Sequence, residues 1–226
     1  MPYMTVMHTA EAVKAIYKNN DFEDFTLIEG FFDPKNDNRL GWAKDGDMGG
    51  ASVGLYKYNR SSDQYILAFR GSKGTKDWVT DDRQITVRTT VDRSNDCIRW
   101  VERVKENRPG AFMMLAGHSL GGYLAQVVGV KCDMPFITYN APPAAVAARL
   151  LTGGGNILKF KKGVNLRINW DPVSGMIGSH VGPVITLPHV GMNIADAHTG
   201  GAIKKSMDQF NGRNTPAMAF ITASNR

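Results

Sequence analysis

The sequence is poor in cysteine and has no long hydrophobic run. Its 226 residues include two cysteines, Cys97 and Cys132, which lie far apart and have no partners at metal-ligand spacing. Free thiols in a reducing compartment fit this pattern better than a disulfide framework or a zinc site. No apolar stretch approaches the roughly 18 residues that a membrane-spanning helix needs. We therefore expect a soluble protein with no transmembrane segment and no metal or other cofactor.

The amino terminus also lacks the basic start, apolar run and small-residue cleavage site of a signal peptide. We expect the protein to be cytoplasmic, or exported without a cleaved signal. The net charge is +6, and the basic residues are spread along the chain. This spread favours an ordinary solvated surface, with peripheral contact to an anionic membrane surface as the alternative. Zinc-finger spacing, RNA-binding aromatic motifs and a long basic arm are absent, so we expect no nucleic-acid partner. The oligomeric state stays open.

Apolar patterning predicts alternating strands and helices, and the length suits a single domain over residues 1–226. The predicted strands are 51–58, 65–69, 111–116, 135–139 and 164–170, and the predicted helices are 5–19, 92–107, 120–130, 144–151 and 202–210. Residues 59–63 have the composition of a hairpin loop. The alternation in the second half indicates an α/β fold with a mostly parallel central sheet, an N-terminal antiparallel hairpin and flanking helices.

The sequence GHSLGG at residues 117–122 contains Gly-x-Ser-x-Gly between an apolar run and a predicted helix. This context is typical of a nucleophile elbow, which raises a serine hydroxyl at the carboxyl end of a sheet. A side chain at Gly117 or Gly121 is expected to collide with neighbouring elements. We therefore predict an α/β-hydrolase fold with Ser119 as its nucleophile. His118 is expected to point away from the active face and to pack.

In an α/β-hydrolase the acid and then the histidine follow the serine along the chain. The candidates after Ser119 are Asp133, Asp171, Asp196 and Asp208 as acids, and His180, His189 and His198 as bases. Asp171 follows a predicted strand and precedes Pro172, which forces a turn directly after the carboxylate. This placement favours Asp171 as the acid, whereas Asp81 and Asp82, before the serine, are expected to be structural.

Three short motifs resemble those of the class 3 lipase family, the fungal triacylglycerol lipase type, and its compact bacterial and phage relatives. They are GHSLGG, Phe-Arg-Gly-Ser at 69–72 followed by Asp-Trp at 77–78, and Asp-Pro-Val at 171–173, within a resemblance that covers residues 50–210. The resemblance implies that Asp171 is the acid and His198 the base, with His189 and His180 as alternatives. It also implies an oxyanion hole formed by the backbone N–H groups of Ser72 and Leu120.

These residues predict a serine carboxylester hydrolase, a lipase or esterase, that uses a Ser-His-Asp triad and an acyl-enzyme intermediate on an ester or lipid substrate. Residues 82–97 occupy the position of the family's lid, but they are polar and also resemble an edge strand. We expect no large lid, which favours esters or phospholipids over bulk triacylglycerol as substrates. A phospholipase A-type effector or phage-associated hydrolase is one alternative. A non-catalytic binding module on a hydrolase scaffold is another.

Overall fold

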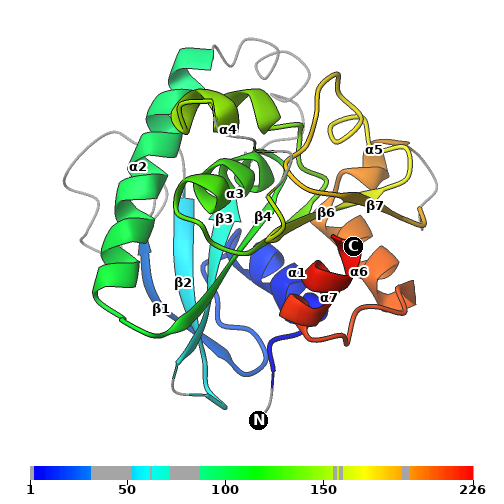
Figure 1. The fold of residues 1–226 in the computed structure, drawn as a ribbon. Coiled ribbons are helices and arrows are strands. Elements are labelled where there is room, and N and C mark those ends of the chain that lie inside the picture. Colours follow the sequence, from blue (N-terminus) through cyan, green and yellow to red (C-terminus); the bar gives the residue numbers. More distant parts are fainter. Residues whose placement is uncertain are drawn as a thin grey trace.

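The computed structural model describes residues 3–31, 52–61, 63–71, 87–154, 157, 160–189 and 194–225. Helices flank a central sheet in this part of the chain (Figure 1). The strands are β1 (Phe25–Phe31), β2 (Ser52–Tyr58), β3 (Gln64–Arg70), β4 (Phe112–His118), β5 (Phe136–Tyr139), β6 (Gly163–Ile168) and β7 (Val184–Leu187). The helices are α1 (Val6–Ala15), α2 (Val87–Glu106), α3 (Leu120–Lys131), α4 (Ala145–Leu151), α5 (Ile194–Ala197), α6 (Gly200–Gln209) and α7 (Ala217–Ser224).

The seven strands lie in the sheet in the same order as in the chain, from β1 to β7. Strands β1, β2 and β3 pair antiparallel, and all pairs from β3 to β7 are parallel. The predicted α/β-hydrolase-type fold, with a mostly parallel sheet and an antiparallel N-terminal part, is therefore confirmed. That part contains one strand more than the predicted hairpin, because β1 pairs with β2. The assignment of residues 1–226 to a single domain stays a prediction.

The strand order explains why one face of the sheet is covered by the crossover helices. Each parallel crossover moves in the same direction along the sheet, and right-handed crossovers then place α2, α3 and α4 on one face. The opposite face is covered by α1, α6 and α7, which come from the two ends of the chain (Figure 1). In β4, Met113 and Leu115 belong to the first of these cores, and Met114 and Ala116 belong to the second. Alternate side chains of β4 therefore lie in the cores on opposite faces of the sheet, as expected for a strand that is apolar throughout.

The stretch before Cys97, for which an edge strand was an alternative, is helical from Val87 onward. Helix α2 begins at Val87, five residues before the predicted start, so the edge-strand interpretation of this stretch is wrong. Val87 and Val91 are four residues apart, a spacing that suits one face of a helix. Residues 82–86, which include Asp82 and Ile85, lie outside the described residues, as does Asp81.

Both cysteines are buried and have free thiols, as expected. Burial raises the pKa of Cys97 to about 12 and that of Cys132 to about 11, so both thiols stay protonated and unreactive at neutral pH. Within the described ranges, no helix combines the length and the apolar character needed to cross a bilayer. The same ranges contain no cluster of His, Cys, Asp or Glu that would hold a metal ion.

Candidate active site

Ser119 stands on a sharp turn between β4 and α3. Its backbone has φ 57° and ψ −131°, a conformation that non-glycine residues rarely adopt and that stores strain at functional sites. A Cβ at Gly117 would lie 2.3 Å from the carbonyl oxygen of Gly121, and a Cβ at Gly121 would lie 2.1 Å from that of Phe69. Both glycines are therefore required by close backbone approach, as the sequence predicted.

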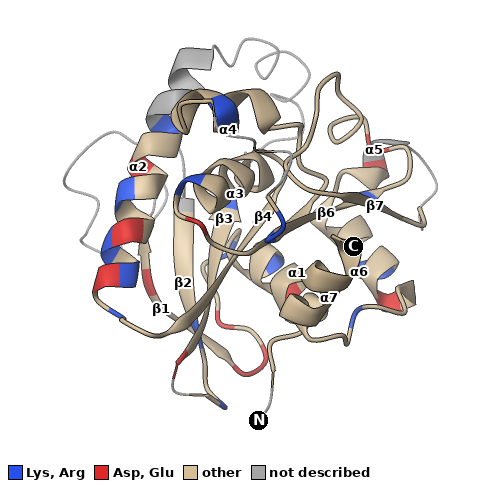
Figure 2. Cartoon of the chain, viewed as in Figure 1, with Lys and Arg blue, Asp and Glu red and all other residues tan. Residues whose placement is uncertain are grey.

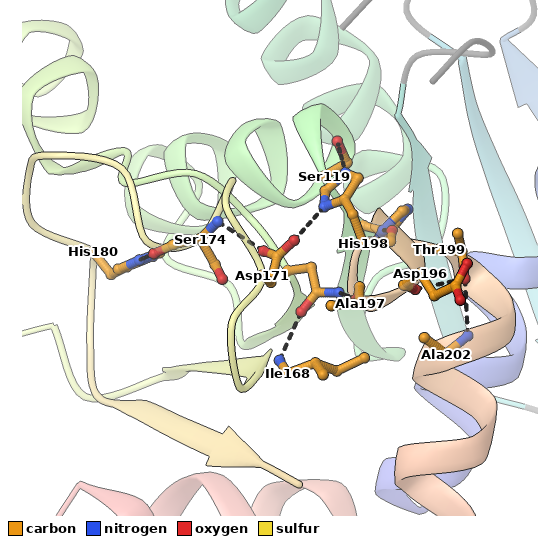
Figure 3. A network of polar contacts seen from close by, with 12 residues as sticks. Ser119, Ile168, Asp171, Ser174, His180, Asp196, Ala197, His198, Thr199 and Ala202 are labelled. Carbon is orange, nitrogen blue, oxygen red and sulfur yellow. Dashed lines mark hydrogen bonds and ion pairs between the residues drawn. The ribbon is translucent and has the colours of Figure 1, made fainter. Parts of the chain in front are cut away.

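Ser119, His198 and Asp171 lie together in a continuous chain of hydrogen bonds, which Figure 3 shows. The Ser119 Oγ is 2.9 Å from Nε2 of His198, and Nδ1 of the same ring is 2.7 Å from Oδ1 of Asp171. A carboxylate only accepts hydrogen bonds, so Nδ1 carries the ring proton. Nε2 then presents its lone pair to the Ser119 hydroxyl. This is the tautomer that a general base for a serine nucleophile requires.

The start of α3 lies beside this hydroxyl. Ser119 is the N-cap residue, but its side chain makes no capping hydrogen bond to the helix, which leaves the hydroxyl directed to His198. Leu120 is the first residue of α3, so its backbone N–H lies at the positive end of the helix dipole. Ser72, the other predicted oxyanion residue, lies outside the described residues, and its role stays a prediction.

The carboxylate of Asp171 is held at the tip of the sheet, shortly after β6. Its side chain is fully buried, and the backbone N–H of Ser174 donates to Oδ2 at 2.8 Å. Burial raises the pKa of Asp171, but the hydrogen bond and charge interaction with His198 and the hydrogen bond from Ser174 outweigh burial, so the pKa is below its ordinary value. The carboxylate is therefore ionised at neutral pH and can stabilise a positive charge on His198.

The other two candidate bases have different partners. The Nε2 atom of His180 donates to the backbone carbonyl of Ser174 at 3.2 Å, which supports the acid loop (Figure 3). His189 stacks on Trp170, with ring centroids 6.2 Å apart. Among the described histidines, His198 is the one within hydrogen-bonding distance of Ser119. Of the alternative acids, Asp133 forms an exposed ion pair with Lys162 at 2.6 Å.

A short turn between α5 and α6 carries His198. Thr199 ends this turn as the N-cap of α6, and its hydroxyl accepts a hydrogen bond from Ala202 (Figure 3). Asn140, directly after β5, donates from Nδ2 to the carbonyl of Ala197 at 2.7 Å and accepts from the N–H of Ile168 at 2.8 Å. Asn140 thus connects the turn that carries His198 to the end of β6, the strand that precedes Asp171. Asn140 was not among the predicted site residues, although a polar side chain directly after a buried strand is a signal for it.

His118 was expected only to pack, but its ring also makes two polar contacts. Its ring is buried, but its Nε2 atom lies 2.8 Å from the backbone carbonyl of His198, and its Nδ1 atom lies 2.9 Å from the hydroxyl of Tyr17. The residue next to the serine therefore contacts the backbone of the histidine that faces the serine. Tyr17 was not among the predicted site residues, because it lies 101 residues before His118 in the chain.

Comparison with known proteins connects this geometry to lipid-cleaving enzymes. The chain is 26% identical over 149 residues to the extracellular phospholipase A1 of Serratia liquefaciens, a match that covers 61% of this chain and 45% of that protein. The match therefore spans less than half of the length of this relative.

Solved structures of fungal lipases share the fold. Lip2 lipase from Yarrowia lipolytica is 17% identical, with a TM-score of 0.54 over 93% of this chain and 91% of that one. A triacylglycerol lipase from Penicillium expansum is 16% identical, with a TM-score of 0.51 over 94% of this chain and 90% of that one. At these identities the likeness shows a common architecture, in agreement with the resemblance to class 3 lipases in the sequence motifs.

A family model places the chain more specifically. The model describes a Tle-like phospholipase domain and matches residues 34–149, slightly more than half of the chain. The matched region includes β4, the turn at Ser119 and the whole of α3. The chain belongs to the family of Tle-like phospholipase domains.

Proposed function

We propose that this chain is a lipase-type serine hydrolase that cleaves a carboxylic ester bond of a phospholipid. One observation carries the proposal: the hydrogen-bonded series from Ser119 through His198 to the buried Asp171. The phospholipid is favoured over other esters by the family of the chain and by the phospholipase A1 among its relatives.

In the first half of the reaction, the Ser119 oxygen attacks the carbonyl carbon of the ester. Nε2 of His198 accepts the hydroxyl proton, and Asp171 stabilises the imidazolium that results. The tetrahedral intermediate then collapses, the bond to the leaving alcohol breaks, and His198 returns the proton to that alcohol. The products of this half are a lysophospholipid and an acyl group esterified to Ser119.

In the second half, a water molecule replaces the alcohol. His198 accepts a proton from this water as its oxygen attacks the acyl-enzyme carbonyl. Collapse of the second intermediate releases the fatty acid, and the Ser119 oxygen recovers its proton from His198. Both intermediates carry a negative oxygen, for which the backbone N–H of Leu120 at the start of α3 is one proposed donor. Ser72 is the other proposed donor.

Exposed apolar side chains close to Asp171 support contact with a lipid surface. Trp170 is 67% exposed, Met176 is 47% exposed, and Ile177 is fully exposed, all within six residues of the acid. Lys and Arg, in contrast, are spread over several elements and interspersed with Asp and Glu, for example along α2 (Figure 2). We propose that this apolar rim, defined by Trp170, Met176 and Ile177, is the part of the described surface that meets the membrane.

A substrate comparison tests the proposal. The wild type is assayed on phospholipid vesicles, on emulsified triacylglycerol and on short-chain p-nitrophenyl esters, with Ser119→Ala as the inactive control. We expect the wild type to release fatty acid and lysophospholipid from the vesicles, and its kcat/KM on phospholipid to be higher than its kcat/KM on triacylglycerol. Hydrolysis of the p-nitrophenyl esters alone would contradict the phospholipid assignment. Inactivity on all three substrates would favour the non-catalytic binding module.

A further inference from the structure

The contacts of His118 and Tyr17 reach three segments that surround Ser119. His118 is the last residue of β4, and Tyr17 lies just after α1, 101 residues earlier in the chain. Their side chains meet at 2.9 Å, between the Tyr17 hydroxyl and Nδ1 of His118. On the far side of the ring, Nε2 lies 2.8 Å from the carbonyl oxygen of His198.

The chemistry of these atoms fixes the direction of each hydrogen bond. A backbone carbonyl only accepts, so Nε2 of His118 carries the proton and donates it to His198. In a neutral ring Nδ1 then accepts, which makes the Tyr17 hydroxyl its donor. The phenol oxygen in turn accepts from the backbone N–H of Gly71, at the end of β3. All four groups in this series are neutral, and the hydrogen bonds run in one direction, from the Gly71 N–H through Tyr17 and His118 to the His198 carbonyl.

Gly71 packs closely against Tyr17, His118 and Ser119. A Cβ at this position would lie 2.6 Å from the Tyr17 hydroxyl, 2.8 Å from the carbonyl oxygen of His118 and 3.0 Å from the Cβ of Ser119. The strand end before Ser72, the elbow and the turn that carries His198 therefore converge on the pair formed by Tyr17 and His118.

We propose that Tyr17 and His118 are positioning residues, which hold the backbone of His198 and of Gly71 in register with Ser119. The inference rests on the proposed function. Asp171 and Ser119 bond to the two nitrogens of the His198 ring, but neither bond holds the backbone of His198. The His118 bond anchors the backbone carbonyl of His198, so that the ring and the backbone are held together. A displacement of about 1 Å between reacting groups can cost on the order of 100-fold in rate.

The charge state of the His118 ring suits a positioning role. Its neighbours among titratable groups are Tyr17 and His198, with Asp171 farther away. Burial first, and then the proximity of His198, lowers the pKa of His118 to about 3. The ring centroids of the two histidines are 4.9 Å apart. A neutral His118 therefore donates to the carbonyl without opposing the positive charge that His198 acquires during each proton transfer.

Two substitutions at one position separate positioning from simple packing. In His118→Gln the side-chain amide reaches the place of Nε2 and can still donate to the His198 carbonyl. In His118→Asn the shorter amide occupies the place of Nδ1, where it can accept from Tyr17 but does not reach His198. We expect kcat to fall about 10- to 100-fold in His118→Asn with KM unchanged, and to stay within about fivefold of the wild type in His118→Gln.

Tyr17→Phe and Tyr139→Phe form a matched pair. Each variant removes a phenol hydroxyl hydrogen-bonded within the fold, and the Tyr139 hydroxyl bonds to Thr9 and to the Val6 carbonyl in α1. We expect both variants to melt at a lower temperature, but only Tyr17→Phe to lower kcat, by about 10-fold. Equal losses of kcat in His118→Asn and His118→Gln, or no loss in His118→Asn and Tyr17→Phe, would overturn the inference.

A second measurement does not depend on activity. Nitrogen-15 NMR of the labelled wild type reports the tautomer of each histidine, and His118 is expected as the neutral ring with its proton on Nε2 throughout neutral pH. An Nδ1 proton, or titration of His118 near pH 6.5, would contradict the hydrogen-bond directions. If the wild type hydrolyses no ester, the proposed function fails, whereas the NMR result still decides whether the positioning contacts exist.

Discussion

At the scale of single residues, the site depends on which atom of each histidine carries a proton. The ionised Asp171 holds the proton of His198 on Nδ1, and the His198 carbonyl holds that of His118 on Nε2. The two rings, 4.9 Å apart, therefore have opposite tautomers. The His198 ring presents its lone pair to the Ser119 hydroxyl, and the His118 ring donates to the backbone of His198. The environment of each ring, rather than the residue type, determines this difference.

Asp171→Asn tests the first of these tautomers. The amide no longer carries the charge that stabilises imidazolium, and it allows the His198 ring to adopt the tautomer with its proton facing Ser119. We expect kcat to fall by about 10⁴-fold, the size of this effect in another serine hydrolase. Steady-state ester hydrolysis measures it. The control is Asp133→Asn, which changes an exposed carboxylate paired with Lys162 and should leave kcat at the wild-type value.

The second tautomer has a consequence for stability. The pKa of His118 is lowered to about 3 by burial and by His198, against 6.5 for an ordinary histidine. Between these values the unfolded chain binds a proton that the folded chain excludes, so the free energy of unfolding decreases as the pH falls below about 6.5. The slope from this one group approaches about 1.4 kcal/mol per pH unit.

His118→Asn removes this proton linkage. We therefore expect its free energy of unfolding to fall less steeply than that of the wild type between about pH 6.5 and pH 5. Urea denaturation at a series of pH values measures both curves. Parallel curves would show that His118 is not excluded from protonation in the folded chain.

At the scale of elements, the strand–turn–helix unit around Ser119 depends on glycine. Gly121→Ala would place a Cβ 2.1 Å from the carbonyl oxygen of Phe69 in β3, where rigid backbone has to move. We expect the free energy of unfolding to drop by about 2–3 kcal/mol, as in overpacked sites, and the reaction of Ser119 with a fluorophosphonate probe to slow. Thermal denaturation measures the loss of stability as a lower melting temperature.

Gly200→Ala is the matched control for that substitution. A Cβ at Gly200, the first residue of α6, would meet no atom within 4 Å. We expect an unchanged or slightly higher melting temperature, because alanine restricts the unfolded chain more than glycine does. If both alanine variants melted alike, the close contact of α3 with β3 would not be what requires glycine at position 121.

The sequence predicted β2 to β6 and the helices α1, α2, α3, α4 and α6, all of which have a regular apolar pattern. Strands β2 to β6 and helix α3 follow from buried runs and from the elbow motif. Strand β1 was missed because its register shifts between Leu27 and Glu29, which breaks the alternation and leaves Ile28 exposed. Strand β7 was missed because it has only four residues, most of them not buried.

The candidate site divides in the same way. Ser119 and Asp171 were predicted because their functions require a turn at a fixed place in the chain, which leaves a local pattern of Gly or Pro. Contacts such as Tyr17 to His118, or Asn140 to Ala197, join segments that are 101 and 57 residues apart. Such contacts depend on how the elements pack, and a single sequence carries no local pattern for them.

At the scale of the whole molecule, two layers of helices enclose the sheet and leave its carboxyl edge for the site. Ser119, Asp171 and Asn140 follow β4, β6 and β5 at this edge, and the apolar rim of Trp170, Met176 and Ile177 lies in the same region of the chain. A lipid surface that covers this rim would bring ester groups to the edge of the sheet. This arrangement agrees with the proposed substrate, a phospholipid held in a membrane.

Ile177→Ser tests this contact. The substitution removes a fully exposed apolar side chain, so we expect it to lower kcat/KM on phospholipid vesicles several-fold and to leave hydrolysis of short soluble esters unchanged. Tyr3→Ser is the control. Tyr3 is also an exposed aromatic residue, at 62%, but it lies before the start of α1, whereas Tyr17 lies after the end of this helix. Equal effects of both substitutions on vesicle hydrolysis would contradict a specific role of the rim.

The central claim is that Ser119 is a nucleophile activated by His198. Labelling with a fluorophosphonate, followed by peptide mapping, tests it most directly because the reagent reacts with an activated serine. We expect a single labelled site at Ser119, loss of labelling in His198→Ala, and normal labelling in His189→Ala. Failure of the wild type to react, or loss of labelling in His189→Ala but not in His198→Ala, would contradict it.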